Sequence, residues 1–164
     1  MIHKRWTKQR TTILCVIVYI ADKYGVSVAD ISTGDYFVTE IPDSAKLLDE
    51  IYRFSPSEII CNEAFYMSGV DMDGMKDRTL ELRFIRLNHG ILTMKYAVKK
   101  LLEHFEVSSF AGLGLADYDC GIISAGALLQ YLLETQKTRF KSDTYYALCR
   151  RQVYDDRQFD KKKS

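Results

Sequence analysis

The chain has 164 residues, of which 47% are hydrophobic and 12% aromatic, enough for one domain with a packed core and too few for two. No apolar run approaches the roughly 20 residues that a bilayer span needs, and the start MIHKRWTKQR lacks the apolar stretch of a signal peptide. We therefore expect a single cytoplasmic domain that does not contact a membrane.

The net charge of +1 conceals an uneven distribution of charge. Residues 1–10 carry four basic and no acidic side chains, and residues 139–164 carry eight basic and four acidic ones. Residues 11–138 therefore hold 11 basic against 18 acidic side chains. A nucleic-acid-binding module usually has a basic face because phosphate neutralisation dominates its affinity, so the acidic body argues against one.

Three short strands are expected near the start of the chain. Residues 13–20 are β-branched and nearly all apolar, which suits a strand buried on both faces. Residues 24–33 and 36–41 each interleave apolar residues with small or polar ones, and Gly34-Asp35 supplies a turn between them. Strands joined by such short turns predict an antiparallel meander.

A helix and a further strand are expected next. Residues 42–44, Pro-Asp-Ser, are a helix start signal, and residues 55–57, Ser-Pro-Ser, end that helix. The run EIIC at residues 58–61 predicts a strand reached by a crossover. Residues 62–78 are less regular, whereas residues 119–137 have apolar side chains at helical spacing and predict the longest helix. This order predicts an α/β layer fold.

Asp30 invites a catalytic interpretation because it lies between apolar residues just before a glycine turn. In RNase H-like nucleases a carboxylate in the first strands holds a divalent metal, and cleavage needs several carboxylates that converge on one site. The acidic residues available for that convergence are Glu50, Glu58, Glu63, Asp117 and Asp119. In the alternative, Asp30 hydrogen-bonds the turn Ser32-Thr33-Gly34, a common role for Asp beside a tight turn. The structural role is the favoured interpretation because nothing in the sequence fixes the convergence.

Other motifs give weaker indications. GLGLAD at residues 112–117 places glycines before a helix but lacks the spacing of a phosphate-binding loop. Four aromatic residues are interpreted as core or partner contacts, since no Arg or Lys interleaves with them as in a base-stacking surface: Phe65, Tyr66, Tyr118 and Tyr131. The cysteines and histidines lack metal-ligand spacing, so the thiols are expected to be buried and reduced: Cys15, Cys61, Cys120, Cys149, His3, His89 and His104.

Three segments, taken together, resemble the connector domain of the MutS family of DNA mismatch-repair proteins. They are YGVSVADISTGDYFVTE at residues 24–40, LLDEIYRFSPSEII at residues 47–60 and AGALLQYLLETQKT at residues 125–138. Each string alone is weak, but their order and separations also fit the family. Residues 101–119 resemble it as well.

The resemblance implies an RNase H-like α/β fold, a mixed β-sheet flanked by α-helices, without nuclease activity, metal or cofactor. In that family the domain joins the mismatch-binding domain to the lever and ATPase domains, and it offers a surface to the partner protein MutL. Mismatched DNA and ATP are bound by other domains of the parent protein. This chain has neither the Phe-x-Glu wedge of the mismatch-reading domain nor a Walker A loop, so we expect a connector and not a competent repair protein.

The resemblance also indicates a partner surface. It places the MutL contact near the segment that contains Leu101-Leu102. Residues that precede a buried Leu pair on an amphipathic helix face solvent. Lys99, Lys100 and Glu103 are therefore expected to be exposed, and they are the candidate MutL-binding residues.

The limits of the domain are expected at the residues where the resemblance to the MutS family ends. Residues 1–12 form a basic N-terminal flank, residues 13–138 the connector domain, and residues 139–164 a basic C-terminal flank that is extended, exposed or disordered. Residues 79–99 also depart from the family. We hypothesise that small insertions or deletions in the gene put these departing segments out of frame, because shifted frames permit family-like sequences there. The apolar patch at residues 82–87 can still pair as a strand, since backbone hydrogen bonding does not depend on side-chain identity.

Overall fold

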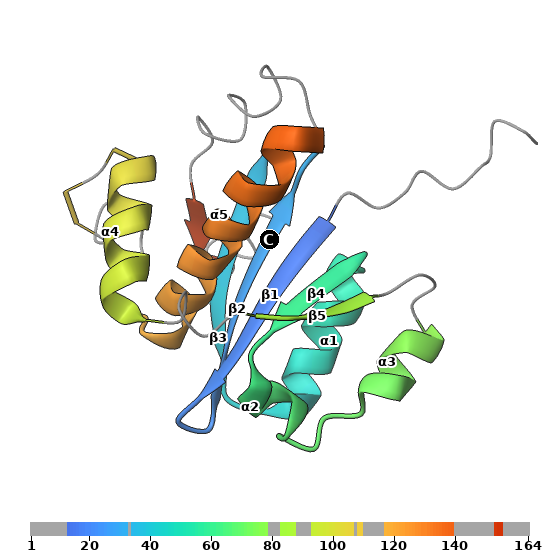
Figure 1. Cartoon of the computed structure of the whole chain (residues 1–164). Helices are drawn as coiled ribbons and strands as arrows, with labels where there is room; N and C mark the ends of the chain where they lie inside the picture. The colour runs from blue at the N-terminus through green and yellow to red at the C-terminus, as the bar shows by residue number, and fades with distance from the viewer. Residues whose placement is uncertain are drawn as a thin grey trace, which may run out of the picture.

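The computed structural model describes residues 13–32, 34–78, 83–87, 93–106, 108–109, 117–139 and 153–155. Its strands are β1 (Ile13–Ile20), β2 (Lys23–Asp30), β3 (Asp35–Ile41), β4 (Glu58–Cys61), β5 (Arg83–Arg86) and β6 (Val153–Asp155). Its helices are α1 (Ser44–Phe54), α2 (Glu63–Tyr66), α3 (Met72–Arg78), α4 (Met94–His104) and α5 (Cys120–Arg139). The strands form one six-stranded sheet in the order β5-β4-β1-β2-β3-β6, with helices on both faces (Figure 1).

The sheet is mixed. β1, β2 and β3 form the predicted antiparallel meander, with Ile13 opposite Asp30 at one end of the first hairpin and Ile20 opposite Lys23 at the other. β4 pairs in parallel with β1, as a crossover through α1 requires, and β5 pairs in parallel with β4. The predicted α/β class, a mixed β-sheet flanked by α-helices, is confirmed.

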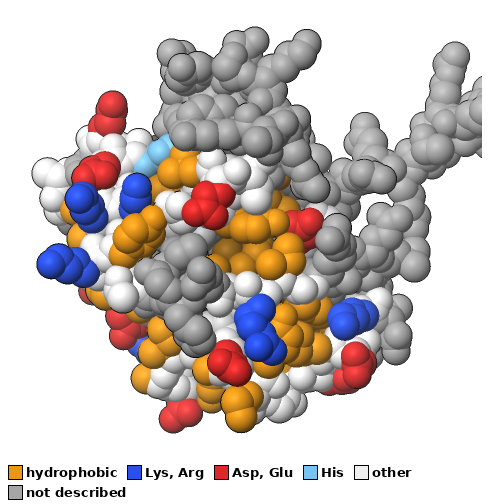
Figure 2. Space-filling model, viewed as in Figure 1, with side chains coloured by type: hydrophobic (Ala, Val, Ile, Leu, Met, Phe, Trp, Pro, Cys, Tyr) orange, Lys and Arg blue, Asp and Glu red, His pale blue; other side chains and the backbone are white. Residues whose placement is uncertain are grey.

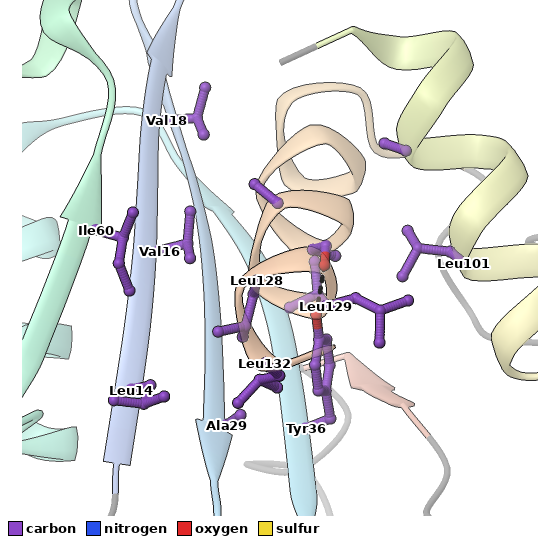
Figure 3. Packing of buried hydrophobic residues seen from close by; sticks show 14 of the residues in the cluster. Leu14, Val16, Val18, Ala29, Tyr36, Ile60, Leu101, Leu128, Leu129 and Leu132 are labelled. Carbon is purple, nitrogen blue, oxygen red and sulfur yellow. Dashed lines mark hydrogen bonds between the residues drawn. The ribbon is translucent and has the colours of Figure 1, made fainter. Parts of the chain in front are cut away.

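Side-chain alternation along β1 divides the core into two layers. Leu14, Val16 and Val18 lie on the face that α5 covers, where they pack with the leucines of that helix (Figure 3). Cys15 and Ile17 lie on the opposite face, which α1, α2 and α3 cover. β1 is therefore buried on both faces, as its continuous apolar run predicted.

Helix α4 forms a further layer beyond α5 (Figure 1). The two helices approach closely where α5 has Gly126, because a Cβ there would lie 2.5 Å from the Cβ of Ala97. Ala97 and Leu101 are fully buried in this contact region. The position of α4 therefore depends on that of α5.

Two segments that departed from the family contain regular structure. β5 and the start of α4 lie within residues 79–99, and the predicted pairing of the patch at residues 82–87 is observed in β5. β6, in the C-terminal flank, pairs in parallel with β3. The rest of that flank beyond Arg139, and residues 1–12, lie outside the described residues.

Candidate functional site

The outer side of α4 carries the candidate partner-binding residues. Lys99 and Glu103 are exposed, one turn apart on the side away from the buried Ala97 and Leu101. Lys100 is only partly exposed, which corrects the expectation that it faces solvent. Its ammonium lies 5.7 Å from the ring centroid of Tyr96, a cation–π contact one turn along the same helix.

Hydrogen bonds fix where α4 begins and how it meets α5. The hydroxyl of Thr93 accepts a hydrogen bond of 3.3 Å from the N–H of Tyr96 and caps the helix. The hydroxyl of Tyr96 lies 2.5 Å from the side-chain oxygen of Gln130 on α5. Lys99 and Glu103 are thus presented on a helix with a defined register against α5.

Asp30 lies at the end of β2, in the turn to β3. Its Oδ1 accepts hydrogen bonds from the N–H of Ser32 at 2.9 Å and from the Ser32 hydroxyl at 2.6 Å. The N–H of Gly34, which has a φ of 79°, donates to the carbonyl of Asp30 at 2.8 Å. Thr33 lies outside the described residues. The structural interpretation of Asp30 requires hydrogen bonds to the adjacent turn, and these contacts are such bonds.

The other acidic candidates are directed to different places. Asp30 shares the sheet face of Val28, on the α1 side, whereas Glu58 lies on the α5 side, where its Oε2 accepts a 2.9 Å hydrogen bond from Tyr131. Asp119 accepts a hydrogen bond from Lys23 at the first residue of β2, whereas Asp30 is the last residue of that strand. At the usual rise of a strand the two ends of β2 lie about 23 Å apart. Of the remaining candidates, Glu50 pairs with Arg53 on α1, Glu63 begins α2, and Asp117 is exposed in the turn before α5.

A polar network joins the start of α5 to the sheet. Oε1 of Glu40, on β3, accepts hydrogen bonds from the N–H of Asp119 at 2.6 Å and the N–H of Gly121 at 3.1 Å. The ammonium of Lys23, on β2, lies 2.7 Å from Oδ1 of Asp119 and 3.4 Å from Oε2 of Glu40. Sequence analysis named Asp119 but missed both sheet residues.

Comparison with known proteins decides the family. A family model described as MutS domain II matches residues 11–144. A DNA mismatch repair protein MutS from Lachnoclostridium phytofermentans is 40% identical over 89% of the chain. The chain belongs to the MutS domain II family. MutS proteins from Halothermothrix orenii and Methanosarcina mazei are 34% and 35% identical over 79% and 70% of the chain.

This MutS domain II spans a small part of those relatives: 16% of the first protein, 14% of the second and 13% of the third. Among solved structures, T. thermophilus RuvC in complex with a Holliday junction substrate has a TM-score of 0.49 and 11% identity, covering 77% of this chain and 96% of that chain. That TM-score is too low to carry an argument about the fold. The α/β assignment follows instead from the sheet topology.

Within the described part of this MutS domain II, one group of side chains has the composition of a metal site. Ligand atoms of Glu40, Asp119 and Cys120 lie within 4.8 Å of one another. The Lys23 ammonium already lies between the two carboxylates, and the Glu40 carboxylate also accepts two helix N–H groups. Burial raises the pKa of the Cys120 thiol to about 12, so it is protonated at neutral pH and a poor ligand. The geometry is that of a structural ion pair and helix cap, and Asp30 has no place in the group.

The electrostatics of the network fit a structural role. The hydrogen bond from Lys23, followed by that from the N–H of Cys120, holds the pKa of Asp119 well below its usual range. The hydrogen bond with Asp119 in turn raises the pKa of Lys23. Both groups are therefore charged across the physiological range, and neither is poised to exchange a proton there.

The remaining predicted residues are mostly structural. Phe65 and Tyr118 are buried, while Tyr66 and Tyr131 are partly buried and pack against the core. Three thiols are free and buried, as expected: Cys15, Cys61 and Cys120. Outside the described residues lie Cys149, His3, His89 and residues 112–116 of the glycine-rich loop. None of the helices that the structure describes is both long and apolar enough to cross a membrane.

Proposed function

We propose that this MutS domain II is a non-catalytic connector in a DNA mismatch-repair protein, where it links the mismatch-binding domain to the lever and ATPase domains. The observation that carries the proposal is the family match over residues 11–144. The scattered carboxylates support a non-catalytic role, since β1 contains no acidic residue and Asp30 and Glu58 lie on opposite faces of the sheet. Mismatched DNA and ATP reach the domain only through the parent protein.

The proposed MutL contact is the outer side of α4. Lys99 and Glu103 are exposed there, with Lys100 held beside them over Tyr96. Among the described elements α4 packs mainly on α5, and Lys99 and Glu103 lie on its side away from the buried Ala97 and Leu101. A surface with this mixture of charges would add to specificity and association rate more than to affinity.

The experiment reverses two charges in the full-length protein that carries this domain. Lys99→Glu combined with Glu103→Lys preserves the net charge and should weaken MutL recruitment to mismatched DNA about tenfold or more, without altering mismatch binding. The matched control is Lys46→Glu with Asp49→Lys, which reverses two exposed charges on α1 across the sheet. Equal recruitment by both variants and the unmodified protein would contradict the proposed surface.

The family role and the surface are tested separately. Deletion of the domain from the parent protein should uncouple mismatch binding from ATP-dependent MutL recruitment, whichever helix makes the contact. A deletion protein that still recruits MutL at a mismatch would refute the connector role itself. Retained recruitment by the α4 variant alone would refute only the assignment of the contact to α4.

A further inference from the structure

The sheet ends in an edge strand on each side, β6 next to β3 and β5 next to β4, and no strand lies beyond either of them among the described residues. Leu87 donates its backbone N–H to the carbonyl of Cys61 in β4 at 2.8 Å. Backbone groups alternate in direction along a strand, so Phe84 and Arg86 direct their N–H and C=O groups away from β4. These four groups form a ready template for another strand.

The same two residues belong to a basic and aromatic cluster on the α1 side of the edge. The Lys76 ammonium lies 5.5 Å from the ring centroid of Phe84, and the Arg86 guanidinium lies 5.2 Å from that of Tyr66. Lys76 and Arg86 are exposed, and Met67, which follows Tyr66, is 82% exposed. In Figure 2, Lys and Arg side chains border hydrophobic side chains over the lower part of the face in view.

We propose that the β5 edge binds an extended peptide segment with carboxylate side chains at alternate positions. The segment adds to the sheet as an extra strand, and its backbone pairs with the outward groups of Phe84 and Arg86. Alternate side chains of an added strand share one sheet face, so those on the α1 side meet the Lys76 and Arg86 charges.

A second copy of the chain is the less suitable occupant. Two-fold pairing of β5 with itself must align residues of the same sheet face, that is Phe84 with Arg86, or each with its own counterpart. Every such arrangement brings Arg86 or Lys76 of one copy beside a positive charge of the other. Like charges directly opposite destabilise a strand pair, whereas carboxylates relieve the repulsion.

Single-stranded nucleic acid is also less suitable. Binding it would use stacking of bases on the Phe84 and Tyr66 rings, but Lys76 and Arg86 already lie over those rings. The body of the chain, residues 11–138, also has more acidic than basic side chains, which opposes binding of a phosphate backbone. The charge and the outward backbone groups together favour the acidic peptide.

The test is an NMR titration of the full chain, labelled with nitrogen-15, with the acetylated and amidated peptide Val-Glu-Val-Glu-Val-Glu-Val. The amide signals of Phe84 and Arg86 should shift most, and a peptide with Lys in place of Glu should bind about tenfold more weakly or not at all. N-methylation of the peptide on alternate residues should abolish binding for one set of positions and spare it for the other, because only one set faces β5.

Variants of the chain complete the test. Arg86→Glu and, separately, Lys76→Glu should each weaken binding of the peptide about tenfold, whereas the control Lys46→Glu on α1 should leave it within about twofold. Circular dichroism checks that each variant is folded. The proposal is overturned if the Glu and Lys peptides bind equally, if neither binds, if a short oligothymidylate competes for the same amides, or if sedimentation shows that the β5 edge joins two copies.

Discussion

The two faces of the sheet hold their helices by different interactions. On the α5 face, directional hydrogen bonds join the helix to the sheet. Glu40 accepts hydrogen bonds from two backbone N–H groups at the start of α5, and Glu58 accepts one from the Tyr131 hydroxyl. On the α1 face the helices pack mainly through apolar side chains, although the Asn62 side chain at the start of α2 exchanges two hydrogen bonds with the backbone of Tyr19 on β1, and charged groups such as Lys76 lie over aromatic rings at the surface. Directional contacts hold a helix in one position, so the α5 face is the better base for α4, the helix on which we propose the MutL contact.

The largest expected effect is at Gly25, where β2 touches the backbone of α5. A Cβ at this position would lie 2.2 Å from the carbonyl oxygen of Cys120, so Gly25→Ala must push the helix from the sheet. We expect a loss of about 3 kcal/mol in the free energy of unfolding, measured by urea denaturation. Gly121→Ala is the matched control: its Cβ would meet the Glu40 side chain at 3.1 Å, which can yield. Equal losses for the two variants would contradict a backbone contact at Gly25.

Glu40→Ala should have the next largest effect. It removes the acceptor for the N–H groups of Asp119 and Gly121, with an expected cost of about 2 kcal/mol. Asp43 is the comparison on the other face, because its Oδ1 accepts from one N–H group among the described residues, that of Lys46 at the start of α1, at 2.8 Å. Asp43→Ala should cost about 1 kcal/mol in the same urea experiment. A larger cost for Asp43 would reverse the comparison between the faces.

The Asp119 carboxylate should make the α5 face sensitive to acid. Because the Lys23 hydrogen bond lowers the pKa of Asp119 in the folded state, the ionised carboxylate stabilises the fold above about pH 4. That stability is lost as the pH falls through the lowered pKa. The effect is modest since the Asp119 side chain is 60% exposed. Asp119→Asn should therefore flatten the fall of the melting temperature below about pH 4, and a fall as steep as that of the unmodified chain would exclude this role.

The smallest effect is expected on the α1 face. Lys76→Ala removes the ammonium over the Phe84 ring at an exposed site, where such a contact contributes about 0.5 kcal/mol. Urea denaturation should detect little change, and the α5 contacts should be unaffected. A loss as large as that for Glu40→Ala would contradict the small contribution expected of this exposed contact.

Much of the sheet could be predicted from local sequence. β1 and β4 have the predicted limits, 13–20 and 58–61, because apolar β-branched runs bounded by turns carry a strong local signal. α2 and α3 were missed in the region interpreted as irregular, residues 62–78. They have four and seven residues, too few to display a helical period.

The polar contacts were harder to predict because their partners are distant in sequence. Glu40 and Asp119 are separated by 79 residues, and Lys23 and Asp119 by 96, so only the folded sheet brings them together. The contacts between cations and aromatic rings were hard to predict for the same reason. No Arg or Lys is interleaved with Tyr66 in the sequence, yet Arg86 reaches it from β5. Asp30, by contrast, contacts the adjacent turn, and a local rule was enough to suggest that bond.

The central claim is that the α5 face holds α4 in place as a partner surface of a connector. The most direct measurement is site-specific photo-crosslinking in the full-length protein that carries this domain, with the crosslinker in place of Glu103 or, as the control, of Lys46 on α1. With purified MutL, mismatched DNA and ATP, position 103 should crosslink to MutL and position 46 should not. A MutL crosslink at position 46 with none at position 103 would contradict the account.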